Sequence, residues 1–176
     1  MILYLFQAAI MAAEDQQVQA IKKLYAETAA TIALAQQGEA GGLYCNELTI
    51  NSRSGSWRAV GNYSKKAAFW YSDQPEFATM EGNDVKSVLV KVEVRETAAV
   101  SSLYREFFFG GGRLLFFFRS EKSGDEPLRE ERIYFRDGKT VLRLLGLEKA
   151  SAAIQTEAIF REAQYWQKLF LLSFAD

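Results

Sequence analysis

The chain has 176 residues, is 49% apolar and carries a formal net charge of −1, with no histidine and one cysteine. The lack of histidine excludes Ser-His-Asp and Cys-His hydrolases in their usual form, and His-ligated zinc as well. One cysteine completes neither a Cys-only metal site nor an intramolecular disulfide. The balance of 21 basic and 22 acidic residues leaves no global basic field for nucleic acid. We therefore expect no metal, no cofactor and no nucleic-acid partner.

The first thirteen residues, MILYLFQAAIMAA, are uncharged and mostly apolar. This run has the length of a signal-peptide core, but it is shorter than the about 20 residues that span a bilayer. The basic residues that normally precede such a core are missing, since the first one is Lys22. Two interpretations stay open. A signal-like segment over 1–13 before one α+β domain over 14–176 predicts export to the periplasm or cell envelope, whereas a long N-terminal helix leaves a cytoplasmic location open.

Apolar side chains at three- and four-residue steps predict a helix over 14–37. From Leu43 the period changes to two, which predicts strands over 43–50, 57–63, 67–72, 86–96, 100–109, 113–119, 129–136 and 139–145. Along 86–96, valines alternate with charged residues, so we expect a half-buried strand with Lys91 and Glu93 on the other face from the valines.

Glycine marks two of the predicted turns. Gly110–Gly112 and the Asp137-Gly138 pair indicate tight hairpins, because glycine adopts positive φ without steric cost. A third hairpin turn is expected at 64–66, and 120–128 is expected to be a polar loop. The aromatic runs on either side of Gly110–Gly112 place rings on both faces, so we expect the sheet to be covered on both sides there.

After Gly146 the helical period returns, and an apolar stripe shared by Ile159, Ala163, Trp166 and Phe170 predicts a helix that packs on the sheet. The short connections predict a meander rather than parallel crossover units. The fold class is therefore α+β, with one strongly curved antiparallel meander of about eight strands and both terminal helices packed on it. A closed calycin-like barrel is the alternative.

Two groups of residues are weak candidates for ligand binding. Arg132 and Arg136 alternate on one predicted strand and Arg143 lies on its partner, which suits an anionic ligand. Six acidic residues balance six basic ones over 119–139, so cross-strand ion pairing on a solvated face is the favoured interpretation. Trp57 and Trp70 form the second group, as a possible aromatic platform, although aromatic residues at this period more often belong to a core.

No catalytic residue emerges from the sequence. Four glutamates lie in predicted strands, but their spacing does not bring two together as a glycosidase requires; these are Glu47, Glu93, Glu106 and Glu131. We expect a non-enzymatic, exported cell-envelope binding or structural module, whose partner is an apolar small ligand or an envelope protein. The alternative is a His-independent enzyme that uses carboxylates, such as a glycoside hydrolase.

The stretch ERIYFRDGK over 131–139, followed by Val141-Leu142-Arg143, resembles the closing hairpin of uncharacterised exported proteins common in Bacteroidetes-type bacteria. Those proteins combine an N-terminal signal, a helix, an antiparallel meander and hairpins of the R-x-Y-F-x-x-G-K kind. The resemblance implies export, and it carries neither an activity nor site residues.

Overall fold

The computed structural model describes residues 2–38, 42–58, 60–82, 84–154 and 156–174, with side chains described from Gln16 onward. Three α-helices, one 3-10 helix and nine strands follow one another in these ranges. In chain order they are α1 (Ile2–Gln36), β1 (Tyr44–Ile50), β2 (Ser56–Trp57), β3 (Gly61–Tyr71), α2 (Pro75–Met80), the 3-10 helix η1 (Val85–Val88), β4 (Leu89–Ala98), β5 (Ser101–Gly110), β6 (Arg113–Ser123), β7 (Glu126–Arg136), β8 (Lys139–Leu145), β9 (Glu148–Lys149) and α3 (Glu157–Leu172).

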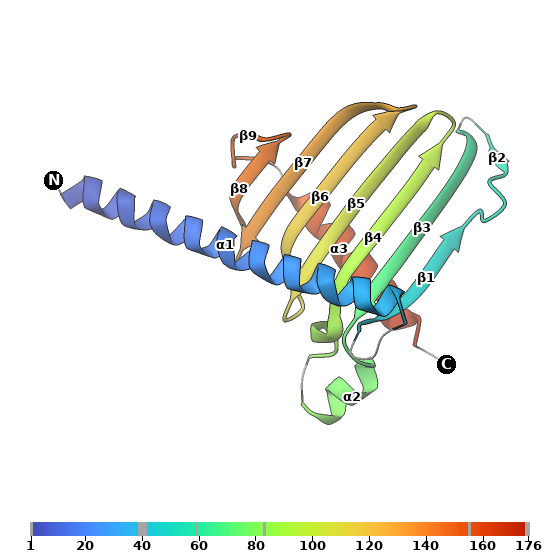
Figure 1. Ribbon diagram of the computed structural model, residues 1–176, viewed down its shortest axis with the longest axis horizontal. Helices are drawn as coiled ribbons and strands as arrows, with labels where there is room; N and C mark the ends of the chain where they lie inside the picture. Colours follow the sequence, from blue (N-terminus) through green and yellow to red (C-terminus); the bar gives the residue numbers. More distant parts are fainter. Residues whose placement is uncertain (1, 39–41, 59, 83, 155, 175–176) are drawn as a thin grey trace.

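The strands form one antiparallel sheet in the order β1-β3-β4-β5-β6-β7-β8-β9, and β2 pairs separately with β3. Neighbours in the sheet are almost always neighbours in the chain, which is the predicted meander (Figure 1). In the described part of the chain β1 and β9 are opposite edges that do not pair with each other, so the sheet is open. The alternative of a closed barrel is therefore wrong.

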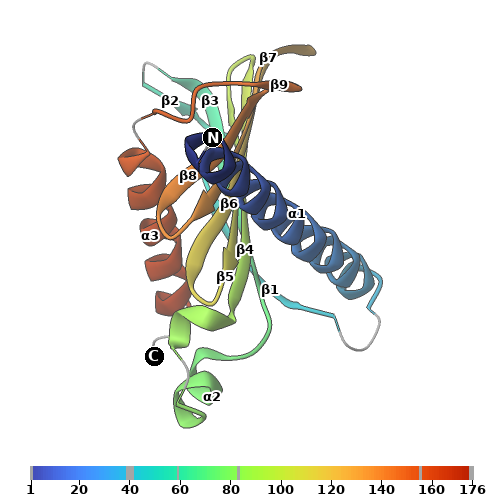
Figure 2. The same cartoon turned by 90° about the vertical axis from the view of Figure 1, so that its left-hand side faces the viewer.

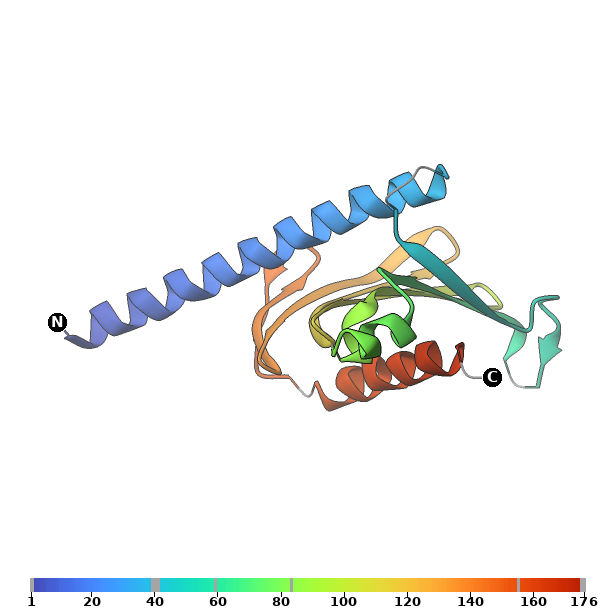
Figure 3. The ribbon, with the colours of Figure 1, turned by 90° about the horizontal axis from the view of Figure 1, so that it is seen from below.

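The two long helices cover opposite faces of the sheet. Figure 2 shows the sheet edge-on, with α1 on one side and α3 on the other. The sheet is curved, and α3 lies on its concave side while α1 crosses the convex side (Figure 3). We refer to these two surfaces as the α3 face and the α1 face. The α+β fold with both terminal helices packed on a meander is thereby confirmed.

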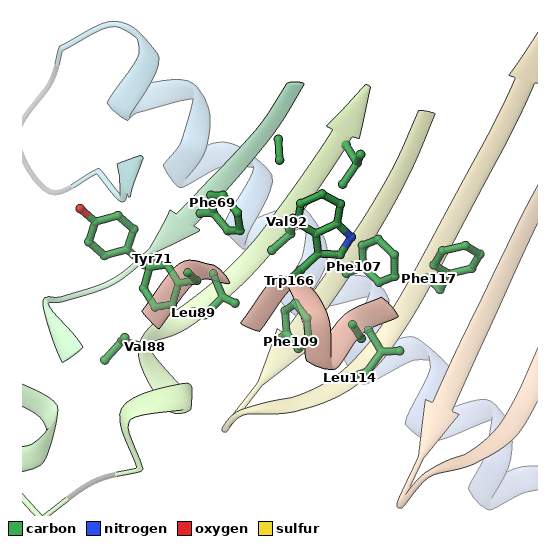
Figure 4. Packing of buried hydrophobic residues seen from close by; sticks show 14 of the residues in the cluster. Phe69, Tyr71, Val88, Leu89, Val92, Phe107, Phe109, Leu114, Phe117 and Trp166 are labelled. Atoms are coloured by element: carbon green, nitrogen blue, oxygen red, sulfur yellow. The ribbon is translucent and has the colours of Figure 1, made fainter. Parts of the chain in front are cut away.

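A continuous apolar core fills the space between the α3 face and α3 (Figure 4). Trp166 and Phe170 point from α3 into this core, and both are almost fully buried, at 1% and 0% exposure. The ring centroid of Phe69 lies 6.1 Å from that of Trp166 and 6.2 Å from that of Phe170. Ile159, predicted in the same stripe, is partly buried against the core. The predicted packing of this helix is confirmed.

A smaller apolar cluster lies between α1 and the α1 face, and its buried members are Val18, Ile21, Phe108, Phe116 and Tyr134. Successive side chains of a strand point to opposite faces, so Phe108 belongs to this cluster while its neighbours Phe107 and Phe109 belong to the α3 core. The expected cover on both sides of the glycine hairpin is confirmed.

Both glycine turns form as predicted. Asp137 and Gly138 have φ values of 49° and 76°, and Gly111 and Gly112 have φ values of 55° and 74°. Two consecutive residues with positive φ are what a type I′ hairpin turn needs. Local turn chemistry therefore fixes the β5–β6 and β7–β8 connections.

Two turn assignments in the sequence are wrong. The segment 64–66 lies inside β3, where Lys65 and Lys66 form ion pairs with Glu96 and Glu47 on the neighbouring strands. The chain turns earlier, just before Gly61, which has φ of 77°. The loop expected over 120–128 is also wrong. Strand β6 runs to Ser123 and strand β7 begins at Glu126, so only a short turn at Gly124 separates them.

Helix α1 is continuous from Ile2 to Gln36. Helical backbone over 2–13 is common to a signal-like segment and to the first part of a long helix, and the side chains there lie outside the described residues. Export therefore stays a prediction. In the described part of the chain, no helix has both the length and the apolar character that crossing a membrane requires.

Candidate functional site

A pocket of about 270 Å³ lies between α1 and the α1 face. This volume lies just below the range of about 300–1,000 Å³ that is typical of ligand sites, so the pocket suits only a small molecule. Four of the eight lining side chains are aromatic, three are charged and one is aliphatic. The lining residues are Ile21, Lys22, Tyr25, Glu106, Phe116, Phe118, Arg132 and Tyr134.

The sheet side of the pocket comes from alternation along β6 and β7. Phe116 and Phe118 are two residues apart, so they point to the same face. The strand register places Tyr134 beside Phe116 and Arg132 beside Phe118. The ring centroids of Phe116 and Tyr134 are 4.9 Å apart. Two neighbouring strands thus supply three rings and one guanidinium group to one surface.

Helix α1 supplies the opposite wall. Ile21 and Tyr25 are four residues apart and therefore share a helix face, with Lys22 beside them. The ring of Tyr25 packs edge-on against Phe108 and Phe116, with centroid distances of 5.4 Å to each. These contacts hold the helix against the sheet at one end of the pocket.

Glu106 lines the pocket, and both its carboxylate oxygens are occupied. The hydroxyl of Tyr25 donates to Oε2 at 2.5 Å, while Oε1 accepts a hydrogen bond from Tyr104 and lies 3.1 Å from Nζ of Lys91. Lys91 also pairs with Glu93, with 2.8 Å between Nζ and Oε1. Lys91 and Glu106 are 5% and 6% exposed, so this is a buried ion cluster with its partners in place.

The cluster shifts the pKa of three of its members. Burial alone would lower the pKa of Lys91, but the carboxylates of Glu106 and Glu93 outweigh it and the pKa is raised. Burial, with the hydrogen bond to Glu106 and its charge, raises the pKa of Tyr25 to about 12. Burial and Glu106 also raise the pKa of Tyr104. At neutral pH, Lys91 is therefore a cation and both phenols are neutral donors.

Three aromatic rings of the pocket each have a protein cation near them. The distances from the cation to the ring centroid are 5.1 Å for Lys91 and Tyr25, 5.2 Å for Arg132 and Phe118, and 5.9 Å for Lys22 and Tyr134. The negative ring faces attract these cations. The rings of the wall are thus already engaged with positive groups of the protein itself.

Arg132 is the only one of the five sequence candidates among the described residues that lines this pocket. It forms an ion pair with Glu130, and its Nη1 donates to the carbonyl oxygen of Gly146 at 3.0 Å. Arg136 lies at the end of β7 and is exposed, with Nε 3.7 Å from a carboxylate oxygen of Asp137. Both arginines have an acidic partner, but each partner lies on the same strand or in the adjoining turn and not across the sheet. The face that Arg132 shares with the buried Tyr134 is covered by α1, so the interpretation of a solvated face with cross-strand ion pairs is wrong for these residues.

Arg143 does not join Arg132. In the β7–β8 register Arg143 lies beside Ile133, whose side chain belongs to the α3 core. Its Nε donates to Oε1 of the buried Glu131 at 2.8 Å. The three arginines proposed for an anionic ligand are thus divided between the two faces of the sheet.

The two tryptophans do not form one platform. Trp57 is exposed on the short strand β2, with its ring centroid 4.7 Å from that of Tyr63. Trp70 is buried on β3, beside Lys91 of β4. Neither side chain lines the pocket under α1.

Sequence reasoning missed the pair Glu93 and Glu106. They lie directly opposite each other on β4 and β5, and Lys91 bridges them. The signal was present, since both Lys91 and Glu106 are charged residues next to buried apolar ones in strong strand patterns. An alternation of charged and apolar residues does not distinguish a solvated face from one that a helix covers.

The described part of the chain holds neither a metal-ligand cluster nor an activated thiol. Among these residues, no three His, Cys, Asp or Glu side chains group as metal ligands. Cys45 lies on the edge strand β1. Partial burial of its thiol, with the charges of Glu47 and Glu93, raises its pKa to about 11. The group is therefore a protonated thiol at neutral pH, which makes it a poor nucleophile.

Fold and site together define an open α+β meander with a ligand-sized pocket under its N-terminal helix. No family model matches the chain, and neither a curated protein nor a solved structure gives a match. The resemblance of the hairpin over 131–139 to exported bacterial proteins stays a prediction.

Proposed function

We propose that this protein is a non-enzymatic binding module of the cell envelope, and that it holds a small apolar or aromatic ligand in the pocket between α1 and the sheet. The observation that carries the proposal is the convergence of four rings on one small space; they belong to Tyr25, Phe116, Phe118 and Tyr134. Burial of a ligand against such a wall contributes about 25 cal/mol per Å² of apolar surface, and ring pairs add about 0.5–1.5 kcal/mol each.

The state of the carboxylates supports binding rather than catalysis. A general acid or base must reach the substrate with a free oxygen or proton. Glu106 uses both oxygens for Tyr25, Tyr104 and Lys91. Its neighbour Glu93 pairs with Lys91 and with Arg95, and it does not line the pocket. A carboxylate that is held in this way fixes the position of α1.

Export is supported by the uncharged run over 1–13 and by the resemblance of the closing hairpin. The test is to express the full chain in a bacterium, separate the envelope fraction and sequence the N-terminus of the purified protein. We expect a processed start close to Glu14. An intact chain in the cytoplasmic fraction would contradict the envelope location and leave the binding proposal to its own test.

Binding is tested by calorimetric titration with naphthylmethanol, a neutral aromatic probe. We expect saturable binding at one site. Phe118→Ala removes one wall and should lower the affinity about tenfold, which corresponds to about 1.4 kcal/mol. The matched control is Phe77→Ala, because Phe77 is an exposed phenylalanine on α2 and lies outside the pocket.

Two results would contradict the binding proposal. The first is no heat of binding, or equal losses in the two phenylalanine variants. The second is hydrolysis of a chromogenic glycoside that is abolished by Glu106→Gln in a folded protein, since this would favour the carboxylate enzyme instead.

A further inference from the structure

We propose that the pocket selects an anionic aromatic ligand and that Lys22 holds the anionic group. This inference rests on the proposed function and specifies the charge of its ligand. It follows from which of the charged groups around the pocket already have a partner and which do not.

The single carboxylate of the pocket is not available to a cationic ligand. Glu106 accepts hydrogen bonds from Tyr25 and Tyr104, and Lys91 stands beside it outside the lining. Its charge is thus compensated within the protein. The remaining charged groups of the lining, Lys22 and Arg132, are both positive.

Lys22 is the cation of the lining that has no acidic partner. Among the described residues no carboxylate forms an ion pair with it, whereas its neighbour Lys23 pairs with Glu27, with 3.9 Å between Nζ and Oε1. Lys22 is instead placed over the ring of Tyr134, with Nζ 5.9 Å from the ring centroid. Its ammonium group is thereby held at the pocket and remains free to pair with an anion.

Arg132 has a different role because it is already engaged. It pairs with Glu130, donates to Gly146 and lies over the ring of Phe118. These contacts fix the guanidinium group at the pocket wall, where it adds positive potential without being a free partner. We therefore assign the direct contact to Lys22 and a smaller electrostatic contribution to Arg132.

A cationic ligand would be disfavoured in this pocket. The rings of Tyr25, Phe118 and Tyr134 attract cations, but Lys91, Arg132 and Lys22 already occupy that role. An ammonium group in the pocket would lie near these like charges without a free carboxylate to compensate it, and such repulsion is a common basis of selectivity. The pocket accordingly favours an aromatic body with a carboxylate or another small anionic group.

The test compares three probes that share one naphthalene ring and differ in charge: naphthalene carboxylate, naphthylmethanol and naphthylmethylammonium. With the full chain at neutral pH and low salt, we expect the carboxylate to bind at least about tenfold more tightly than the alcohol. The ammonium compound should bind most weakly. The advantage of the carboxylate should shrink as salt is raised, because Lys22 is exposed to solvent.

Two variants assign the selectivity to its residue. Lys22→Gln should lower the affinity for the carboxylate to a value close to that for the alcohol. Lys23→Gln is the matched control, since it removes the same charge from the adjacent position of α1 and should preserve the ratio.

Three outcomes would overturn this inference. Equal binding of carboxylate and alcohol would do so while leaving the proposed binding function intact. If Lys22→Gln and Lys23→Gln changed the ratio of carboxylate to alcohol affinity equally, only the overall charge of the protein would matter. Failure of all three probes to bind would remove the inference together with the proposed function.

Discussion

The two faces of the sheet are each covered by a helix, yet they are built from different chemistry. The α3 face holds a continuous apolar core around Trp166 and Phe170, with the ion pair of Arg143 and the buried Glu131 beside it. The α1 face combines a smaller apolar cluster with the buried charges of Lys91 and Glu106. The aromatic pocket under α1 lies on this second face.

The difference lies in the contacts that hold each helix against the sheet. On the α3 face, apolar side chains of α3 pack directly against those of the sheet. Charged groups instead require partners at defined distances and directions. The hydrogen bond from Tyr25 to Glu106 fixes α1 at one point, and the rings beside it are left lining a space. The α3 face therefore carries the larger apolar core, while the α1 face carries the aromatic pocket.

The largest expected effect tests the α3 face. Trp166→Ala should lower the free energy of unfolding by about 3–5 kcal/mol, because it removes a large side chain that is 1% exposed. Tyr165→Ala, at the exposed adjacent position, should cost far less. Denaturant unfolding of both variants measures this. Similar values for the two would mean that α3 contributes little to the core.

The stability of the α1 face should depend on the positive charge of its buried ion cluster. Lys91→Met leaves Glu93 and Glu106 facing each other without their common cation, so we expect a loss of about 3 kcal/mol in the free energy of unfolding. Lys66→Met is the control, because its ion pair with Glu47 is half exposed and should contribute less than about 1 kcal/mol. A small effect of Lys91→Met would show that the cluster is open to water.

The contribution of the α1 face to stability should also fall at alkaline pH. The pKa of Tyr25 is raised to about 12 in the folded protein, above its usual value of about 10, so the folded state retains the phenol proton more tightly. The resulting stabilisation is complete below about pH 10 and is lost as the pH rises toward 12. Unfolding followed between about pH 9 and 12 should show a smaller decline in the free energy of unfolding for Tyr25→Phe than for the unchanged protein. Identical declines in the unchanged protein and in Tyr25→Phe would show that this phenol is exposed to solvent in the folded state.

The smallest effect is expected at the rim of the pocket. The side chain of Arg132 is 29% exposed and that of its partner Glu130 is 41% exposed, so Arg132→Ala should change stability by less than about 1 kcal/mol. Arg136→Ala, at an exposed pair on the same strand, should behave alike. Thermal unfolding compares them. A loss of several kcal/mol at Arg132 alone would reveal a structural role beyond this ion pair.

Elements governed by local chemistry could be predicted from the sequence. The Asp137-Gly138 turn follows from the backbone freedom of two adjacent residues, and the stripe of Trp166 and Phe170 follows from the helical period. Errors arose where a polar segment met no strong turn signal. Lys65 and Lys66 continue a strand because glutamates on both neighbouring strands pair with them, and those partners are distant in the sequence.

The sequence by itself determined the meander, its closing hairpin and the helix that packs on the concave face, because side-chain period and turn residues act within a few positions. The tertiary structure decided that the sheet stays open, that Arg143 and Arg132 lie on opposite faces, and that α1 covers Lys91. These outcomes depend on strand register and on where a helix rests across several strands. The pocket belongs to this second group, because its walls come from α1, β5, β6 and β7 and only packing brings them together.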